Sequence, residues 1–244
     1  MFKRLLLILL LLSINSFAID KRLENHPKAN RLYKEFSKTQ DHTIAFDLAL
    51  FYEDTLKDST NAIYWYKKSY RTGSSRAALN LGQHYESLKK HNDAVEWYKK
   101  AYDRSDVKAA LSLGLLYKSQ KQYSLAVEWY KKAYAQGNMD GANGLGYLHD
   151  VVLKDEEKGV LWYKKGAQGG NPDAINNLGR TYHAKGDDTK ASAYILAMVN
   201  YGYTKKEVLD FLKNNWKIDR VTLEKAYQLQ QTLDIPKHYT GGID

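Results

Sequence analysis

The sequence predicts an all-α chain that folds as a solenoid of about five helix-turn-helix repeats. The phrase Trp-Tyr-Lys-Lys recurs about every 32 residues, a spacing typical of one helical hairpin, and it begins at Trp65, Trp97, Trp129 and Trp162. Half a repeat later the chain carries a leucine followed by a small residue, at Leu48-Ala49, Leu81-Gly82, Leu113-Gly114, Leu145-Gly146 and Leu178-Gly179. Two markers that alternate at a fixed interval indicate two helices in every repeat.

The first residues are typical of a leader for export. Two basic residues precede an apolar run at residues 5–12, and Ser16 and Ala18 place small side chains where a signal peptidase cuts. We therefore expect a signal peptide over residues 1–18 and a mature chain that is periplasmic or secreted. An uncleaved anchor is the rival interpretation, but the apolar run falls short of the roughly 20 residues that span a bilayer. No stable membrane insertion is expected after cleavage.

Composition narrows the function further. The chain has no cysteine, which excludes disulfides, thiolate metal sites and a lipid anchor on a cysteine. Its formal net charge is +9 and stays positive without the leader, which favours acidic partners, anionic lipid or a cell-wall polymer. However, much of this charge lies in the lysine pairs of the repeated phrase, where it also serves solubility.

An N-terminal cap is expected over residues 19–42. Its apolar side chains fall on one face of a helix, at Ala29, Leu32, Tyr33 and Phe36. The helix is predicted over residues 27–38, because Pro27 suits a first turn. Leu32 and Tyr33 stand where Trp and Tyr stand in the repeats, so this segment is interpreted as half a repeat.

Each repeat then supplies two amphipathic helices. In the repeat around Trp97 the two apolar stripes are Ala78, Leu81, Gly82, Tyr85 and Ala94, Trp97, Tyr98, Ala101. Glycines that suit a left-handed residue follow the second helix, at Gly73, Gly137, Gly170 and Gly202, and Ser105 is the exception. The glycines of the Leu-Gly pairs lie inside a helix, where they cost about 0.5–1 kcal/mol relative to Ala, so we expect a neighbouring helix to approach closely there.

These phrases resemble the Sel1-like repeat, a relative of the tetratricopeptide repeat. The segment at residues 126–138 and the repeat around Trp162 carry the resemblance most clearly, and it covers residues 43–203. The resemblance implies a right-handed α-solenoid that binds protein. One departure is that Gly82 and Trp97 are separated by the tetratricopeptide length, whereas Sel1-like repeats usually have a longer loop, and this argues against a ligand site on that loop.

The array is expected to end with the fifth repeat. There Tyr194-Ile195-Leu196-Ala197 replaces the repeated phrase, so a solvated face becomes apolar and needs a cover. Capping helices are predicted over residues 204–233. The tail over residues 234–244 is interpreted as irregular, either docked or mobile.

The search for catalytic chemistry is negative. None of the histidines belongs to the His-Glu-x-x-His pair of a zinc protease. They are His26, His42, His84, His91, His149, His183 and His238. The sequence also lacks a nucleophile elbow and a phosphate-binding loop. We therefore expect no catalytic residue, no metal site, no cofactor and no enzyme activity.

The repeated aromatic residues suit a core better than a stacking platform for nucleic acid or sugar. The Trp and Tyr of each phrase lie at core spacing, so we expect both columns to be buried and no nucleic acid to bind. Lys99 and Lys100 should then face the outer, convex surface. Solubility is one interpretation of the lysine pairs, and a patch for anionic membrane or wall polymer is the other.

A concave groove lined by the first helices is the predicted binding site, because solenoids bind along such surfaces. Three positions per repeat define it: three before the small residue (Phe46, Leu79, Leu111, Asn143, Asn176), one after it (Leu50, Gln83, Leu115, Tyr147, Arg180) and four after it (Glu53, Glu86, Lys118, Asp150, His183). The pattern is an apolar strip edged by acids early and by Arg180 and His183 later. Alternatively, Leu79 and Leu111 pack under the adjacent helix, and the polar members are only solvated.

The expected function is binding of another protein. The resemblance implies adaptor roles, and for some exported bacterial members it implies an immunity protein that neutralises a lipase toxin of type VI secretion. We expect such an immunity role in the periplasm. An envelope scaffold or host-interaction adaptor is an open alternative, and so is a β-lactamase-like enzyme, although the relatives linked to that activity are rich in cysteine. The partner's identity and the oligomeric state are left open.

Overall fold

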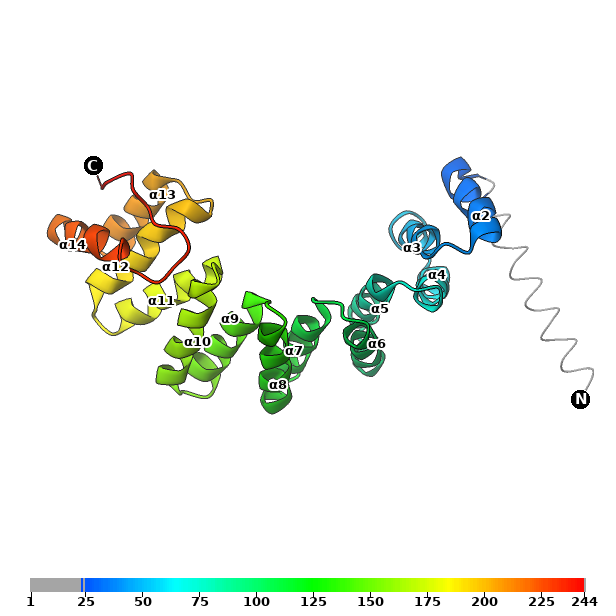
Figure 1. Ribbon diagram of the computed structural model, residues 1–244, viewed down its shortest axis with the longest axis horizontal. Coiled ribbons are helices and arrows are strands. Elements are labelled where there is room, and N and C mark those ends of the chain that lie inside the picture. Colours follow the sequence, from blue (N-terminus) through cyan, green and yellow to red (C-terminus); the bar gives the residue numbers. More distant parts are fainter. Residues whose placement is uncertain (1–22, 24, 244) are drawn as a thin grey trace, which may run out of the picture. The chain divides into compact units, whose positions relative to one another are not determined.

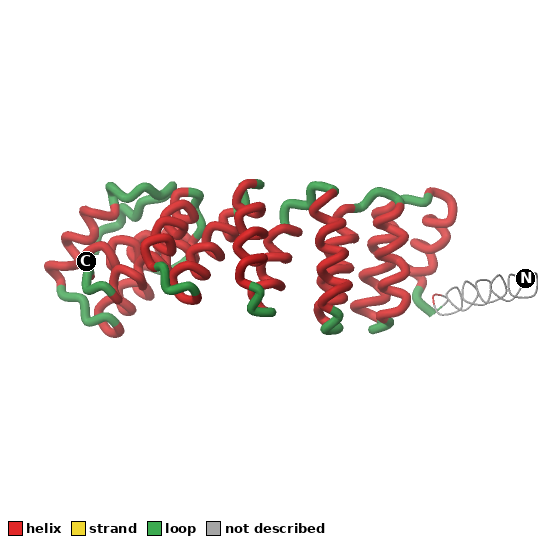
Figure 2. The backbone as a smooth tube through the Cα atoms, turned by 90° about the horizontal axis from the view of Figure 1, so that it is seen from below, coloured by secondary structure: helices red, strands yellow, loops and turns green. Residues whose placement is uncertain are grey.

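The structure is a computed structural model that describes residue 23 and residues 25–243. The predicted signal peptide over residues 1–18 lies outside the described residues. Every regular element in the described part is helical, which confirms the all-α prediction (Figures 1 and 2). The chain divides into two compact units, Met1–Asp106 and Val107–Asp244, and each is described by itself.

The first compact unit holds the N-terminal cap and the first two repeats. Its described elements are α2 (Pro27–Thr39), α3 (His42–Leu50), the π-helical turn η1 (Phe51–Thr55), α4 (Ser59–Arg71), α5 (Ser75–Ser87) and α6 (His91–Asp103). α3 pairs with α4 and α5 pairs with α6, so each repeat is a helical hairpin. α2 packs against α3 as the predicted cap.

The second compact unit holds three repeats and a C-terminal cap. Its helices are α7 (Ala109–Ser119), α8 (Tyr123–Ala135), α9 (Met139–Tyr147), α10 (Glu156–Gln168), α11 (Pro172–Ala184), α12 (Asp188–Ala197), α13 (Lys205–Asp210) and α14 (Arg220–Gln230). Short helical turns extend three of them, at η2 (Leu148–Val152), η3 (Met198–Tyr201) and η4 (Phe211–Asn215). The hairpins are α7 with α8, α9 with α10, and α11 with α12.

The helix ends follow the sequence signals. Side chains at the N-caps accept backbone hydrogen bonds, as Ser74 does from Ala77 and Asn171 does from Ala174. All four predicted glycines have a positive φ, from 80° at Gly170 to 129° at Gly73. Ser105 adopts the same left-handed conformation with φ 61°, so the turn geometry is kept although a Cβ makes it costlier.

The glycines of the Leu-Gly pairs meet a tyrosine ring. A Cβ on Gly82 would lie 2.5 Å from Cδ1 of Tyr98, and one on Gly114 would lie 2.5 Å from Cδ1 of Tyr130. Each tyrosine comes from the second helix of the same hairpin. The predicted close approach is therefore confirmed, and the Tyr of the repeated phrase is the group that approaches.

Burial of the repeated phrase is confirmed with one exception. The four tyrosines of the phrases are buried, and so are Trp65, Trp97 and Trp129. Trp162 is only half-buried, and it contacts Tyr134 edge-on at 5.5 Å. The prediction of a fully buried tryptophan column is therefore wrong at Trp162.

The lysine pairs do not simply point away from the core. Lys99 is exposed, but the ammonium of Lys100 lies 4.1 Å from the centroid of the Trp97 ring and pairs with Glu96. The same cation–π contact recurs between Lys132 and Trp129 at 3.9 Å. Because i and i+3 are neighbours on a helix, the second lysine lies over the tryptophan ring in these two repeats, and the first lysine stays exposed. In the first repeat Lys67 is only half-exposed, and its ammonium lies 5.9 Å from the Trp97 ring centroid.

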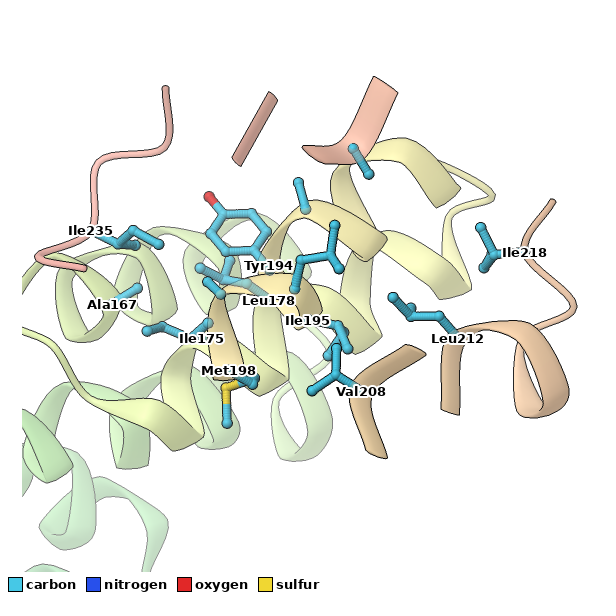
Figure 3. Packing of buried hydrophobic residues seen from close by; sticks show 14 of the residues in the cluster. Ala167, Ile175, Leu178, Tyr194, Ile195, Met198, Val208, Leu212, Ile218 and Ile235 are labelled. Atoms are coloured by element: carbon cyan, nitrogen blue, oxygen red, sulfur yellow. The ribbon is translucent and has the colours of Figure 1, made fainter. Parts of the chain in front are cut away.

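The apolar face of α12 is covered, as predicted. Tyr194, Ile195 and Leu196 join a core cluster that also includes Leu223 of α14 and Ile235 of the tail (Figure 3). α14 packs along α12 and not as the partner of α13, so these helices form a cap rather than a sixth repeat.

The tail is docked. The backbone N–H of Tyr239 donates to Oε1 of Gln230 over 3.0 Å, and its carbonyl accepts hydrogen bonds from the side-chain amides of Gln230 and Gln231. Ile235 is buried, which anchors the start of the tail. The docked alternative for residues 234–243 therefore holds.

Candidate functional site

The candidate site is the solvent-facing side of the first helices, α3 with η1, α5, α7, α9 with η2, and α11. We call it the first-helix face and treat its parts in the two compact units separately. It carries the positions that the sequence assigned to a groove.

The position one after the small residue is accessible in four of the five repeats. Gln83, Leu115, Tyr147 and Arg180 are exposed, and Leu50 is half-buried. This position is therefore the part of the predicted groove that is accessible to a partner.

The position three before the small residue serves packing in the first compact unit. Phe46 and Leu79 are 9% and 5% exposed, and the Phe46 ring contacts Tyr66 edge-on at 5.7 Å. The structure therefore places both side chains in the core, as the packing alternative expected for Leu79 but not for Phe46, which was assigned to the groove. Leu111, Asn143 and Asn176 are half-buried and remain at the surface.

The early acids satisfy buried phenols. The hydroxyl of Tyr66 donates to Glu53 over 2.5 Å, and that of Tyr98 donates to Glu86 over 2.7 Å. Burial raises the pKa of both tyrosines, and the hydrogen bonds to these carboxylates raise it further. Glu53 also bonds Nδ1 of the buried His84 over 2.5 Å. Both carboxylates therefore make hydrogen bonds within the fold and are not free charges of the predicted groove.

The corresponding residues of the second compact unit are arranged differently. Lys118 replaces the acid, and its ammonium lies 5.1 Å from the Tyr147 ring centroid. The buried hydroxyl of Tyr130 has no hydrogen-bond partner among the residues that the structure describes. Asp150 accepts a long 3.5 Å hydrogen bond from the hydroxyl of Thr181. In the second unit these polar side chains therefore make fewer hydrogen bonds within the fold than in the first.

His183 is also engaged by the fold. Its Nδ1 lies 2.7 Å from a carboxylate oxygen of Asp188, and its ring stacks on Trp216 at 4.2 Å between centroids. The two rings are nearly parallel, with an interplanar angle of 9°. His183 thus secures α11 to the C-terminal cap.

Two hollows meet at Arg180. The first, which we call the Tyr147 hollow, has a volume of about 490 Å³ and is lined by Tyr147, Asp150, Val151, Glu156, Tyr163, Asn177, Arg180, Thr181, Ala184 and Lys185. The second, which we call the Phe211 hollow, has a volume of about 350 Å³ and is lined by Asn176, Arg180, Ile195, Met198, Tyr203, Glu207, Val208 and Phe211. Both belong to the second compact unit.

Three exposed apolar residues at these hollows were not predicted. Val151 lies in η2, whose π-helical turn shifts the register that the sequence pattern assumed. Tyr203 follows the left-handed Gly202, and Phe211 begins η4. The sequence signal for η2 is one extra residue between Gly146 and Trp162, compared with the separation of Gly82 and Trp97.

Neither metal chemistry nor a membrane span is indicated by the described part. Within residue 23 and residues 25–243, no three His, Asp or Glu side chains are grouped so that they could hold a metal ion. No helix in that range is both long enough and apolar enough to cross a bilayer.

Comparison with protein families finds two kinds of repeat. The Sel1 repeat matches residues 45–74 and 140–171, and the tetratricopeptide repeat matches residues 75–106, 107–135 and 172–200. The Sel1 matches contain η1 and η2, whereas α5, α7 and α11 of the other matches have no π-helical turn. The family difference thus corresponds to a physical one, the length of the first helix.

Comparison with solved structures supports the same fold. A Sel1 repeat protein from Oxalobacter formigenes is 23% identical over 88% of this chain and 98% of its own, with a TM-score of 0.58. The protective antigen c5321 of uropathogenic Escherichia coli is 24% identical over 82% of this chain, with a TM-score of 0.62. The chain spans about half the length of c5321, at 47%. A search of curated proteins found no match.

Proposed function

The chain belongs to the Sel1-like and tetratricopeptide repeat proteins, and on this premise we propose that it binds another protein through the first-helix face of its second compact unit. Repeat proteins of this type present side chains from successive hairpins on one continuous surface. The first compact unit uses several of these positions for its own core. The second keeps them at the surface.

One observation carries the proposal. Leu115, Tyr147 and Val151 are 45%, 40% and 42% exposed, and all three lie on first helices or their extensions. A cluster of exposed aliphatic and aromatic side chains with a polar edge is typical of a protein–protein interface. Burial of such anchors on binding is the expected source of affinity.

More specifically, we propose that the chain is an immunity protein. The leader-like residues 1–18 support export to the periplasm, and the family resemblance supports a role in neutralising a lipase toxin delivered by type VI secretion. On this view the first-helix face covers the toxin and blocks its activity. Export and the identity of the partner are both part of the proposal.

The test uses two leucines of similar exposure on different faces. Leu115 lies on α7, in the first-helix face, whereas Leu125 is 39% exposed on the second helix α8. Cells that express a toxin encoded beside this gene should survive with the wild-type chain and with Leu125→Asp, but not with Leu115→Asp. Co-purification of toxin and chain should follow the same order.

The outcomes separate the two levels of the proposal. If Leu115→Asp and Leu125→Asp protect equally and capture equally, the first-helix face is not the binding surface. If the face captures an envelope protein and gives no protection against any neighbouring toxin, the immunity role is wrong and the scaffold role takes its place.

A further inference from the structure

Three carboxylates, of Asp150, Glu156 and Glu207, and two cations, Arg180 and Lys185, line the two hollows. Each carboxylate there already has a donor. Glu156 pairs with Lys185, Glu207 caps the N-terminus of α13 through Thr204, and Asp150 accepts from Thr181.

Arg180 differs from these groups. Among the described residues, no hydrogen bond or ion pair engages its guanidinium, and its side chain is exposed. A guanidinium offers five donors in a planar fork that fits a carboxylate. Arg180 is therefore the charged side chain of these hollows whose donors are left to solvent or to a ligand.

The Phe211 hollow suits a large apolar side chain. Its floor includes Ile195, Met198 and Val208, which belong to the core cluster and lie close together (Figure 3). Tyr203 and Phe211 stand at its rim, 51% and 37% exposed. Because the floor is part of the core, the hollow is formed before any partner arrives, which limits the entropy lost on binding.

The position of Arg180 distinguishes an internal segment from a chain end. Arg180 lines both hollows. A segment that places a carboxylate at Arg180 can continue in both directions and fill both hollows. A terminal carboxylate would leave one of them empty.

We propose that Arg180 binds the side-chain carboxylate of an Asp or Glu in an internal segment of a partner protein, and that an aromatic or large aliphatic residue beside this acid enters the Phe211 hollow. This inference rests on the proposed function and names the chemistry of its partner. It adds Tyr203 and Phe211, which the groove predicted from the sequence does not contain.

The probe is a random library of 12-residue peptides displayed on phage and panned against the purified full chain. Enriched sequences should carry an acid next to a large apolar residue. Synthetic versions are then titrated by fluorescence anisotropy against the wild type, Arg180→Gln and Tyr203→Ser. Arg71→Gln is the matched control, because Arg71 is an exposed arginine on α4 in the other compact unit.

Arg180→Gln should weaken the selected peptides at least about tenfold, since a charge-assisted hydrogen-bond pair is lost. Replacement of the peptide's acid by its amide should cost a similar factor in the wild type and little more in Arg180→Gln, because the two changes remove one interaction. Tyr203→Ser should weaken binding, and Arg71→Gln should not. Amidation of the peptide's C-terminus should have no effect.

Three results would overturn the inference. They are a library without the acidic and apolar pattern, equal binding by Arg180→Gln and the wild type, or loss of binding on amidation of the chain end. Each leaves the proposed function standing if Leu115→Asp still abolishes capture of the partner. If Leu115→Asp and Leu125→Asp capture alike while the peptides still depend on Arg180, the part of the first-helix face at Leu115 is not used and the Arg180 site remains.

Discussion

The two compact units use the same repeat positions in different ways. In the first, Phe46 and Leu79 are buried and Glu86 bonds the hydroxyl of Tyr98. In the second, Leu111 is only half-buried at the position of Leu79, and Lys118 stands at the position of Glu86. A position in the repeat therefore does not have a fixed role, because its neighbours decide whether a side chain completes the core or faces a partner.

The largest expected effect concerns the tryptophans of the repeated phrase. Trp97→Ala should lower the free energy of unfolding by about 3–5 kcal/mol, because a buried indole leaves a cavity. Trp162→Ala should cost clearly less, since the half-buried Trp162 loses fewer contacts. Denaturant unfolding followed by circular dichroism measures both, and equal losses would contradict the difference in burial between Trp97 and Trp162.

Reversing the charge of the side chain at Glu86 or Lys118 should change the free energy of unfolding in opposite directions. Glu86→Lys leaves the buried hydroxyl of Tyr98 without its acceptor and should cost about 1–3 kcal/mol. Lys118→Glu should give the unpartnered hydroxyl of Tyr130 an acceptor and stabilise by about 0.5–1.5 kcal/mol. Lys131→Glu, an exposed change of the same charge, is the control. Destabilisation by Lys118→Glu would show that the two phenols do not have equivalent surroundings.

The smallest expected effect is a pH dependence in the second unit. His149 stands where other repeats have tyrosine, and burial lowers its pKa from the usual 6.5. The unfolded chain then binds a proton at a higher pH than the folded chain, so stability should fall as pH drops below about 6.5. Nearby capping carboxylates such as Asp155, whose pKa is lowered by its hydrogen bonds with Lys158, add their own loss only near pH 4 and below.

His149→Tyr should remove the loss near pH 6, as measured by thermal unfolding between pH 5 and pH 8. The control is His91→Tyr, because His91 is exposed on α6. An unchanged pH profile in His149→Tyr would assign the dependence to another group.

Much of the fold was predictable because helices have a period and solenoids repeat it. The spacing of Trp97 and Gly82 predicted both helices of a hairpin, and the positive φ of Gly137 confirms the turn that follows. The loss of the phrase at Tyr194 correctly located the end of the array. Local patterns sufficed because each repeat contacts mainly its neighbours.

The candidate site was predictable only in part. The exposed column through Leu115, Tyr147 and Arg180 lies where the periodicity placed it. The π-helical turns were not anticipated, since one extra residue in a helix barely alters an apolar pattern. Val151 and Phe211 come to the surface through such turns, and the sequence alone therefore could not assign them to a site.

The sequence by itself determined the helical repeats, their turns and the residues that fill each hairpin, because these depend on spacing along one chain. Only the tertiary structure decided which charges are already bound, as Glu53 is by Tyr66 and His84. It alone placed Arg180 at two hollows, one of which is completed by α12 and the C-terminal cap. The physical reason is that hydrogen-bond partners and hollows arise between elements, where spacing within one helix carries no information.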